Sequence, residues 1–248
     1  MTNSTKTATA PCQICNSPNA PLYATNDGLC LYKCESCGLV YLDPMLSLES
    51  VSNLYSDAYC GTTTGYFAKA DKKLRRARRL LKKIRNKASG NKFLDVGCNG
   101  GFTMEAARET GFSAHGIELD GASLDYARKN FPGNDYFQGT VQQYQTTMQF
   151  DVVYCSEVIE HVSDVNSFLS AIAQLMKPNA LLYLTTPDIG HWRRPKNIYD
   201  WDAFCPPSHC LYFNPSNLAK LLVSHGFDII KIRWAWKPGI RLYAKRLT

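Results

Sequence analysis

From residue 92 onward, apolar runs typical of buried strands alternate with segments of helical periodicity. The predicted strands are 92–94, 113–117, 135–139, a run from Phe150, and 181–185, and the predicted helices between them are 102–110, 121–130 and 164–176. This alternation predicts a parallel sheet covered by helices. A helix beginning at Asn214 and Pro215 follows, and two strands, 228–236 and 240–245, predict a closing antiparallel hairpin.

A basic helix is predicted over residues 67–88, where Leu74, Ala77, Leu81 and Ile84 recur at helical spacing. Residues 69–87 contain eleven Lys and Arg and a single acidic residue, a local net charge of +10 in a chain whose total is +7. A charge confined to one helix argues against general nucleic-acid binding. The helix either forms a solvated cover for the sheet or contacts an anionic surface or a phosphorylated carrier.

Two C-x2-C pairs lie near the N-terminus, at Cys12 and Cys15 and at Cys34 and Cys37. This spacing is typical of a structural zinc site with four thiolate ligands, and the metal replaces a core that so short a segment cannot build. Reduced cysteines that meet by chance are the alternative. A redox role is less favoured because no βαβ pattern surrounds either pair.

The length of 248 residues fits one large domain with a small appendage. We predict a disordered tail over 1–10, a zinc ribbon over 11–44, a helical linker or lid over 45–90, and the main domain over 91–248. The N-terminus lacks the apolar stretch of a secretory signal, and no apolar run reaches the length of a membrane span. A cytoplasmic location follows as the expectation.

A glycine-rich turn, LDVGCNGG, spans Leu94 to Gly101 between a predicted strand and helix. Glycines allow a sharp turn and a close ligand approach, and a helix N-terminus offers unpaired N–H groups. Glu118 ends the next strand, 23 residues after Asp95, where doubly wound folds hold a ribose. An ordinary strand-to-helix connection is the alternative. No Lys-Ser/Thr follows the turn, which argues against a P-loop.

LDVGCNGG and the following GIELD resemble the first two motifs of class I S-adenosylmethionine (SAM) methyltransferases. Asn99 stands at the middle glycine of that pattern, and asparagine tolerates left-handed backbone. FDVV followed by SEVIEHV resembles the fourth-strand motif, and the cysteine region resembles the zinc ribbon of a small-molecule group similar to ubiquinone-biosynthesis O-methyltransferases. The resemblance implies a Rossmann-like, seven-stranded α/β sheet with an antiparallel last strand, plus the small N-terminal zinc ribbon.

The resemblance also implies which residues bind SAM. They come from the glycine turn, the ends of the following strands, and two tyrosines of the segment before the first strand. They are Asp95, Gly97, Cys98, Asn99, Gly101, Glu118, Leu119, Gln138, Thr140, Val141, Ser156, Glu157, Tyr59 and Tyr66. Thr140 stands where the family often has an acid, so adenine recognition is expected from backbone groups or from Gln138 and Val141.

His161 and His209 are the candidate catalytic residues, because an acceptor hydroxyl must lose a proton and a histidine suits that work. A packing or helix-capping role is the alternative for His161. His209 lies in the aromatic-rich connection 188–213, which we expect to form a lid over the acceptor. A metal site formed by Cys205, His209 and Cys210 is disfavoured because adjacent His and Cys ligands are geometrically awkward.

SAM-dependent methyl transfer to a small molecule, at oxygen rather than at nitrogen or carbon, is the leading hypothesis. A nucleic-acid methyltransferase with a zinc-ribbon reader is the second. The fourth strand lacks the Asp/Asn-Pro-Pro-aromatic turn that holds a flipped base, which argues against it. A non-catalytic SAM-binding module is the third.

Overall fold

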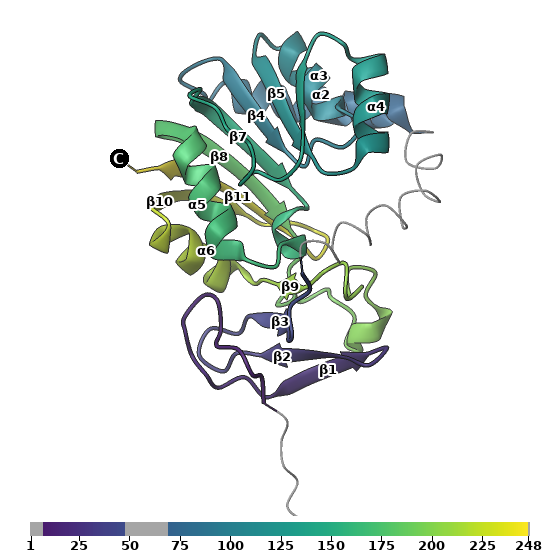
Figure 1. Ribbon diagram of the computed structural model, residues 1–248, viewed down its shortest axis with the longest axis vertical. Helices are drawn as coiled ribbons and strands as arrows, with labels where there is room; N and C mark the ends of the chain where they lie inside the picture. The colour runs from purple at the N-terminus through teal and green to yellow at the C-terminus, as the bar shows by residue number, and fades with distance from the viewer. Residues whose placement is uncertain (1–6, 48–68, 248) are drawn as a thin grey trace, which may run out of the picture.

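A seven-stranded sheet forms the centre of the computed structural model, which describes residues 7–47 and 69–247 (Figure 1). Its strands are β4 (Lys92–Val96), β5 (Ser113–Glu118), β6 (Asp135–Gln138), β7 (Phe150–Ser156), β8 (Met176–Thr186), β10 (Phe227–Arg233) and β11 (Ile240–Arg246). The strand order is β10-β11-β8-β7-β4-β5-β6. Strands β4 to β8 are parallel, and β11 runs antiparallel to both of its neighbours. The predicted α/β sheet with an antiparallel last strand is confirmed.

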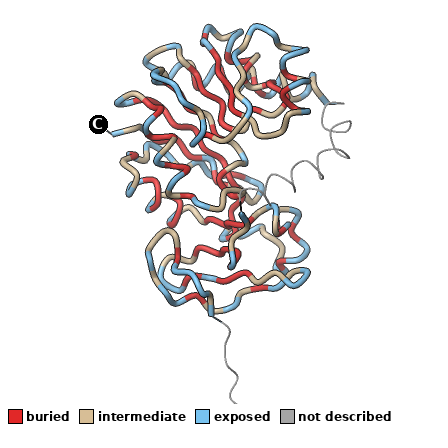
Figure 2. Tube along the Cα trace, in the orientation of Figure 1, coloured by how far each residue is buried: buried red, intermediate tan, exposed pale blue. Residues whose placement is uncertain are grey.

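Helices cover both faces of this sheet, and the buried residues follow its strands (Figure 2). One face carries α2 (Ala70–Arg85), α3 (Phe102–Glu109) and α4 (Gly121–Asn130), and the other carries α5 (Val165–Leu175) and α6 (Pro215–Ser224). Asp120 and Asp164 accept hydrogen bonds from the backbone N–H groups of Ser123 and Ser167, which confirms both predicted helix starts. No helix in the two described ranges is long and apolar enough to cross a bilayer.

The apolar stripe of α2 packs on the sheet as its spacing predicts. Ala77, Leu81 and Ile84 are buried, whereas most of the cations of this helix stay exposed. Arg78 forms two hydrogen bonds of 2.6 Å with the Glu109 carboxylate at the end of α3. This helix therefore covers the sheet with one narrow face and presents positive charge on the rest.

The segment Lys177–Asn179, which lies between the predicted helix 164–176 and the predicted strand 181–185, is part of β8. Met176 already pairs with Phe150, and the register then shifts before Val152 pairs with Leu181. The turn-like residues form an irregularity inside the strand, with Asn179 at a φ of 61°.

A second, smaller sheet contains β1 (Leu22–Asn26), β2 (Leu29–Lys33), β3 (Val40–Leu42) and β9 (Leu211–Tyr212), in that order. β9 belongs to the connection 188–213 and pairs with β3, next to the larger sheet (Figure 1). Buried Trp201 and Phe204 pack against Tyr212 of β9. Leu211 and Tyr212 of the connection therefore complete the small sheet, because neighbouring aromatic residues find their buried partners there. The lid over an acceptor stays a prediction.

Residues 7–10, expected within a disordered tail, are held against the small sheet. Ala8 donates a backbone hydrogen bond of 2.9 Å to Ala20. The buried Asp43 carboxylate accepts hydrogen bonds from the backbone N–H and the hydroxyl of Thr9. A buried carboxylate needs such donors, and that requirement orders these polar residues.

Candidate active site

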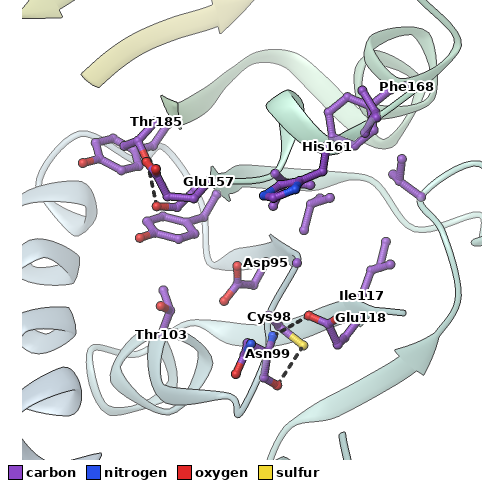
Figure 3. A pocket seen from close by; sticks show the side chains of 18 of the residues that line it. Asp95, Cys98, Asn99, Thr103, Ile117, Glu118, Glu157, His161, Phe168 and Thr185 are labelled. Carbon is purple, nitrogen blue, oxygen red and sulfur yellow. Dashed lines mark hydrogen bonds between the residues drawn. The ribbon is translucent and has the colours of Figure 1, made fainter. Parts of the chain in front are cut away.

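A pocket of about 1280 Å³ lies at the carboxyl ends of the parallel strands (Figure 3). It is lined by residues at the carboxyl end of each strand or just beyond it: Asp95, Gly97, Cys98 and Asn99 at β4, Glu118 and Leu119 at β5, Thr140 and Val141 at β6, and Ser156 and Glu157 at β7. Single-ligand pockets usually measure about 300–1,000 Å³. This one is large enough for a nucleoside cofactor together with a second molecule.

The glycine turn adopts left-handed backbone at three positions, Gly97, Asn99 and Gly101, with φ values of 77°, 46° and 77°. A Cβ atom at Gly97 would lie 2.4 Å from Val158 Cγ2, so only glycine fits there. Asn99 accepts a hydrogen bond of 2.7 Å from the N–H of Gly100 through its own side chain. The expectation that asparagine supports this turn in place of glycine is confirmed.

Glu118 joins the glycine turn to the start of α4. Its carboxylate accepts hydrogen bonds from the backbone N–H groups of Asn99 at 2.8 Å, Leu119 at 2.8 Å and Asp120 at 3.0 Å. Burial raises the pKa of Glu118, and these bonds act in the opposite direction. A carboxylate has about four acceptor positions. At least one therefore stays available to a hydroxyl in the pocket.

Asp95, the last acidic residue of β4, is 2% exposed and lies between the glycine turn and His161 (Figure 3). Burial, and then the charge of Glu118, raise its pKa well above the ordinary range. The carboxyl groups of Asp95 and Glu118 thus lie in one region of the pocket wall. Hydrogen bonds from hydroxyl or amino groups of a ligand would compensate for the cost of burying them.

Two predicted cofactor residues do not line the pocket. Gln138 is exposed at the end of β6 and packs beside Gly121. Gly101 caps α3, and a Cβ there would lie 2.9 Å from the Tyr136 hydroxyl, so its role is to shape the turn. Tyr59 and Tyr66 lie outside the described residues.

His161 belongs to the 3-10 helix η1 (Ile159–His161), directly after β7, and its imidazole points into the pocket (Figure 3). Its Nδ1 lies 2.7 Å from the carbonyl oxygen of Ser208. A carbonyl can only accept, so Nδ1 carries the proton and Nε2 carries the lone pair. Burial, and then His209, lower the pKa of His161 to about 4. The ring is neutral at pH 7 and able to accept a proton.

His209, the other candidate base, lies behind His161 and is not among the described residues that line the pocket. The two rings meet edge to face with centroids 4.5 Å apart. Nδ1 of His209 lies 2.7 Å from the carbonyl oxygen of Ala203, and burial lowers the pKa of this ring too. Of the two histidines, only His161 therefore lines the pocket in which an acceptor would bind.

Glu160 lies fully buried beneath the histidine pair. Its Oε2 accepts a hydrogen bond of 2.9 Å from Thr186, and its Oε1 lies 4.0 Å from Nε2 of His161 without a hydrogen-bond partner among the described residues. One ligand atom each from Glu160, His161 and His209 lie within 4.8 Å of one another. The cluster has the spacing either to hold a cation or to share a proton.

Glu157 takes left-handed backbone, with a φ of 57°, at the first position after β7. Its N–H donates to the carbonyl of Thr185 at 2.9 Å, and its carboxylate accepts from the Thr185 hydroxyl at 2.7 Å. Left-handed backbone is costly for a non-glycine residue. The left-handed conformation at Glu157 turns the chain sharply from β7 into η1 and so supports the orientation of His161.

Sequence patterns missed a row of tyrosines on the wall next to α2. Tyr154 of β7 is paired with Asp95 of β4 and with Tyr183 of β8, and Tyr183 is paired with Tyr243 of β11. All four side chains therefore lie in one row on the same face of the sheet and line the pocket. Thr103, Ile117 and Phe168 were missed as well. Single-strand patterns could not reveal these residues because the strand register was unknown.

The four N-terminal cysteines form one cluster. Sγ of Cys12 lies 3.5 Å from Sγ of Cys37, and Sγ of Cys15 lies 3.4 Å from Sγ of Cys34. Tetrahedral zinc with bonds of about 2.3 Å requires sulfurs about 3.8 Å apart, so a small expansion suffices. The hydrogen bond with Cys37 lowers the pKa of Cys12 to about 5, which favours the thiolate. The donor set fits zinc.

Both cysteine turns contact the larger sheet's helices. Between the first two cysteines, the Gln13 side chain donates to the carbonyl of Ser163 at 2.8 Å and accepts from the N–H of Val165 at 3.0 Å. At the second turn, Asn217 of α6 donates to the carbonyl of Cys37 at 3.3 Å. The cluster is thus linked directly to the segment between His161 and α5.

The strand order, the glycine turn and the acidic end of β5 together define the fold of class I SAM-dependent methyltransferases. The comparisons with known proteins agree. The family model described as a methyltransferase domain matches residues 66–232, and the chain belongs to that family.

Curated relatives include the ubiquinone biosynthesis O-methyltransferases of Pasteurella multocida and Histophilus somni. The first is 31% identical over 157 residues, which cover 52% of this chain and 65% of the relative. The second is 32% identical over 160 residues, which cover 54% of this chain and 67% of the relative. Each match therefore spans only about two thirds of the relative's length.

Solved structures show the same fold at low identity. A 1,6-didemethyltoxoflavin-N1-methyltransferase from Burkholderia thailandensis was solved with bound 1,6-didemethyltoxoflavin and S-adenosylhomocysteine. The match covers 92% of this chain and 99% of that protein, with a TM-score of 0.61 and 14% identity. A SAM-dependent methyltransferase from Mesorhizobium loti covers 68% of this chain and 96% of its own, with a TM-score of 0.57 and 19% identity.

Substitutions at Glu157 test the left-handed turn after β7. Glu157→Ala and Glu157→Gly both remove the hydrogen bond between the Glu157 carboxylate and the Thr185 hydroxyl. Only the alanine variant still has a side chain that makes the left-handed backbone unfavourable. Left-handed backbone costs an L-residue about 1–2 kcal/mol, and glycine avoids this cost. The greater conformational entropy of glycine in the unfolded chain offsets part of the gain. In denaturant unfolding we therefore expect the glycine variant to be more stable than the alanine variant by about 1 kcal/mol. An alanine variant at least as stable as the glycine variant would contradict the assignment.

The stability of the protein should depend on the protonation of His161. Its folded-state pKa of about 4 lies below the ordinary value of 6.5, so the unfolded chain binds the proton first as pH falls. Stability is therefore full above pH 6.5 and declines toward pH 4. From pH 7 to 5 we expect wild type to lose about 1–2 kcal/mol more than His161→Asn in urea unfolding. Equal losses in the two proteins would contradict the burial of a neutral ring.

Proposed function

We propose that this protein is a SAM-dependent methyltransferase that acts on a hydroxyl oxygen of a small molecule. The observation that carries the proposal is the Glu118 carboxylate, fixed beside the glycine turn at the strand ends of a chain in the methyltransferase domain family. The names of the relatives, ubiquinone biosynthesis O-methyltransferase, favour oxygen as the acceptor atom. The pocket volume supports a second ligand beside the cofactor.

The residues of the pocket fit the parts of SAM. Glu118 would accept hydrogen bonds from the ribose, as acidic residues at this strand end do in nucleotide-binding folds. The turn Gly97–Asn99 and buried Asp95 would hold the methionine part, with Ser156 and Glu157 beside it. Leu119, Thr140 and Val141 would enclose the adenine. The Thr140 N–H already donates to the Gln143 side chain, so its neighbours rather than this N–H would bind the base.

Methyl transfer from a sulfonium is a displacement with a good leaving group, so the protein mainly aligns the acceptor, excludes water and removes a proton. His161 is the proposed base. Its Nδ1–H donates to Ser208, so Nε2 carries the lone pair that would accept the proton of an acceptor hydroxyl. The buried Glu160 carboxyl, 4.0 Å from that nitrogen, would stabilise the resulting imidazolium.

His209 is then a positioning residue. It packs against the edge of His161 and is itself oriented by the carbonyl of Ala203. Burial lowers the pKa of both rings, and two close imidazoles disfavour a second positive charge once one of them is protonated. Catalysis by His209 itself is less favoured, because His161 stands between it and the pocket.

We also propose that the cysteine cluster holds one structural zinc ion and that the ribbon of residues 11–44 folds around it. The sulfur spacing supports this proposal. None of the nine described cysteines forms a disulfide, which is consistent with the reducing cytoplasm as the location.

Nucleic-acid methylation is the second candidate function, because a zinc ribbon and a basic helix occur together. Against it, β7 ends at Ser156 and Glu157 follows, in place of a turn that holds a flipped base. A non-catalytic SAM-binding module is the third candidate, and turnover with any acceptor would exclude it.

Metal analysis tests the zinc proposal. We expect one zinc per chain in purified protein, none in Cys34→Ser, and a melting temperature about 10 °C lower in that variant, since structural zinc contributes several kcal/mol and each kcal/mol corresponds to about 2–4 °C. Cys205→Ser, which replaces an exposed cysteine outside the cluster, is the control and should keep zinc. Zinc retained in Cys34→Ser would refute this ligand set.

Calorimetry and a radioactive methyl-transfer assay test the main proposal. Wild type should bind S-adenosylhomocysteine, and Glu118→Gln should bind it at least about tenfold more weakly, because one charged acceptor is lost. With catechol or another phenol as acceptor, His161→Asn should bind the cofactor normally but lose about 10²-fold in kcat. Wild-type protein without affinity for SAM or its product would overturn the proposal.

A further inference from the structure

One wall of the pocket is formed by cations that the proposed methyl transfer does not use. Arg76, Arg79 and Lys83 of α2 line it, together with Arg233 and Arg241 of the hairpin β10–β11. All five side chains are exposed, and none forms an ion pair within residues 7–47 and 69–247. The acidic residues of the pocket lie elsewhere: Asp95 in β4, Glu118 at the end of β5, Glu157 after β7 and Asp164 at the N-cap of α5.

Strand register explains why the hairpin arginines face this pocket. Arg241 of β11 pairs with Thr185 of β8 and with Arg233 of β10. Thr185 lies two residues beyond Tyr183, so Arg241 and Arg233 lie on the same face as the tyrosine row, next to Tyr243. The cations therefore form a rim around an aromatic surface rather than a scattered surface charge.

The tyrosine row is a packed and rigid surface. The Tyr154 and Tyr183 rings are stacked with centroids 5.2 Å apart, and Tyr183 meets Tyr243 edge to face at 4.9 Å. Burial raises the pKa of Tyr183 to about 12, while the charges of Arg241, Arg76 and Arg233 act in the opposite direction. Three arginines from separate elements are thus close enough to influence a single phenol.

A second hollow of about 640 Å³ continues the cationic wall between α2 and the hairpin. It shares Lys83, Arg233 and Tyr243 with the main pocket, and its lining adds further lysines. These are Lys87, Lys231 and Lys245. No carboxylate lines it among the described residues, and Lys87 lies 5.9 Å from the Tyr243 ring centroid. Positive charges gathered in a concave site repel one another and favour an anion of more than one charge.

We propose that this wall, formed by Arg76, Arg79, Lys83, Arg233 and Arg241 beside the tyrosine row, binds a phosphoryl group of the methyl acceptor. The proposal rests on the proposed function and narrows its substrate class to a small molecule that carries a phosphate or diphosphate. Guanidinium groups suit phosphoryl oxygens because each can donate two parallel hydrogen bonds. The tyrosines would pack against the part of the acceptor between the phosphoryl group and the reacting hydroxyl.

The shape of the site favours a small molecule over a membrane or a nucleic acid. The cations line the cofactor pocket itself and a hollow that shares lining residues with it, whereas a bilayer or a duplex is bound by an extended surface. The other exposed cations of α2, among them Lys72, Arg75 and Lys82, line neither hollow. Only the side of α2 that faces the hairpin therefore belongs to the site.

Calorimetry with inorganic pyrophosphate tests the proposal on protein saturated with S-adenosylhomocysteine. We expect wild type to bind pyrophosphate, and Arg76→Gln and the double variant Arg233→Gln/Arg241→Gln to bind it at least about tenfold more weakly. Arg75→Gln and Lys82→Gln remove the same charge from the same helix outside the hollows, and we expect these controls to stay within about twofold of wild type. All variants should keep wild-type affinity for S-adenosylhomocysteine, because none alters the cofactor residues.

Three outcomes would overturn the proposal. The first is that wild type does not bind pyrophosphate. The second is that control and site variants lose pyrophosphate affinity equally. The third is that wild type binds phosphatidylglycerol vesicles or a single-stranded oligonucleotide but not pyrophosphate, and that the site variants abolish this binding. Titration with S-adenosylhomocysteine distinguishes a failure of the phosphoryl-site proposal from a failure of the proposed function. Intact cofactor binding without pyrophosphate binding refutes only the phosphoryl site, whereas absent cofactor binding refutes the proposed function.

Discussion

The register of four adjacent strands is the constraint on which the whole site depends. Because β4, β7, β8 and β11 are aligned at Asp95, Tyr154, Tyr183 and Tyr243, one row of side chains crosses the sheet from the cofactor end to the hairpin. A shift of one residue in any strand would turn its side chain to the opposite face. The irregularity in β8 is therefore informative, since the four residues after Met176 are absorbed before the row begins.

The site also depends on the part of the chain farthest from it in sequence. Gln13 lies between two cysteines of the cluster and holds the backbone of Ser163 and Val165, close to His161. Ser208, which orients His161, lies on the connection that provides β9 to the small sheet. The cysteine turn and the connection attached to the small sheet thus support the region of the same 3-10 helix from two directions. This arrangement gives the ribbon a role in positioning, whether or not it touches an acceptor.

Local patterns predicted most of the fold, because helix caps, the glycine turn and strand-ending acids each act within a few residues. Asp120, Asp164 and Asn99 behave as their neighbours in sequence suggest. The features that local patterns did not reveal come from contacts between distant segments. Asp43 orders residues 7–10 by accepting their hydrogen bonds. The path of the 188–213 connection depends on its pairing with β3, and the place of His209 depends on its packing against His161. Neither periodicity nor spacing carries that information.

The pairing of β9 with β3 has a consequence for how such a chain can be recombined. Residues 7–47 do not form a cassette that can be cut out, because the edge of their sheet is completed by residues 211–212. Grafting the N-terminal piece alone would leave the outer edge of β3 at Val40 and Tyr41 without its partner strand, and an open strand edge promotes association. A transferable unit must contain two separate stretches of sequence. Gain or loss of the ribbon therefore requires matched changes at two points of the chain.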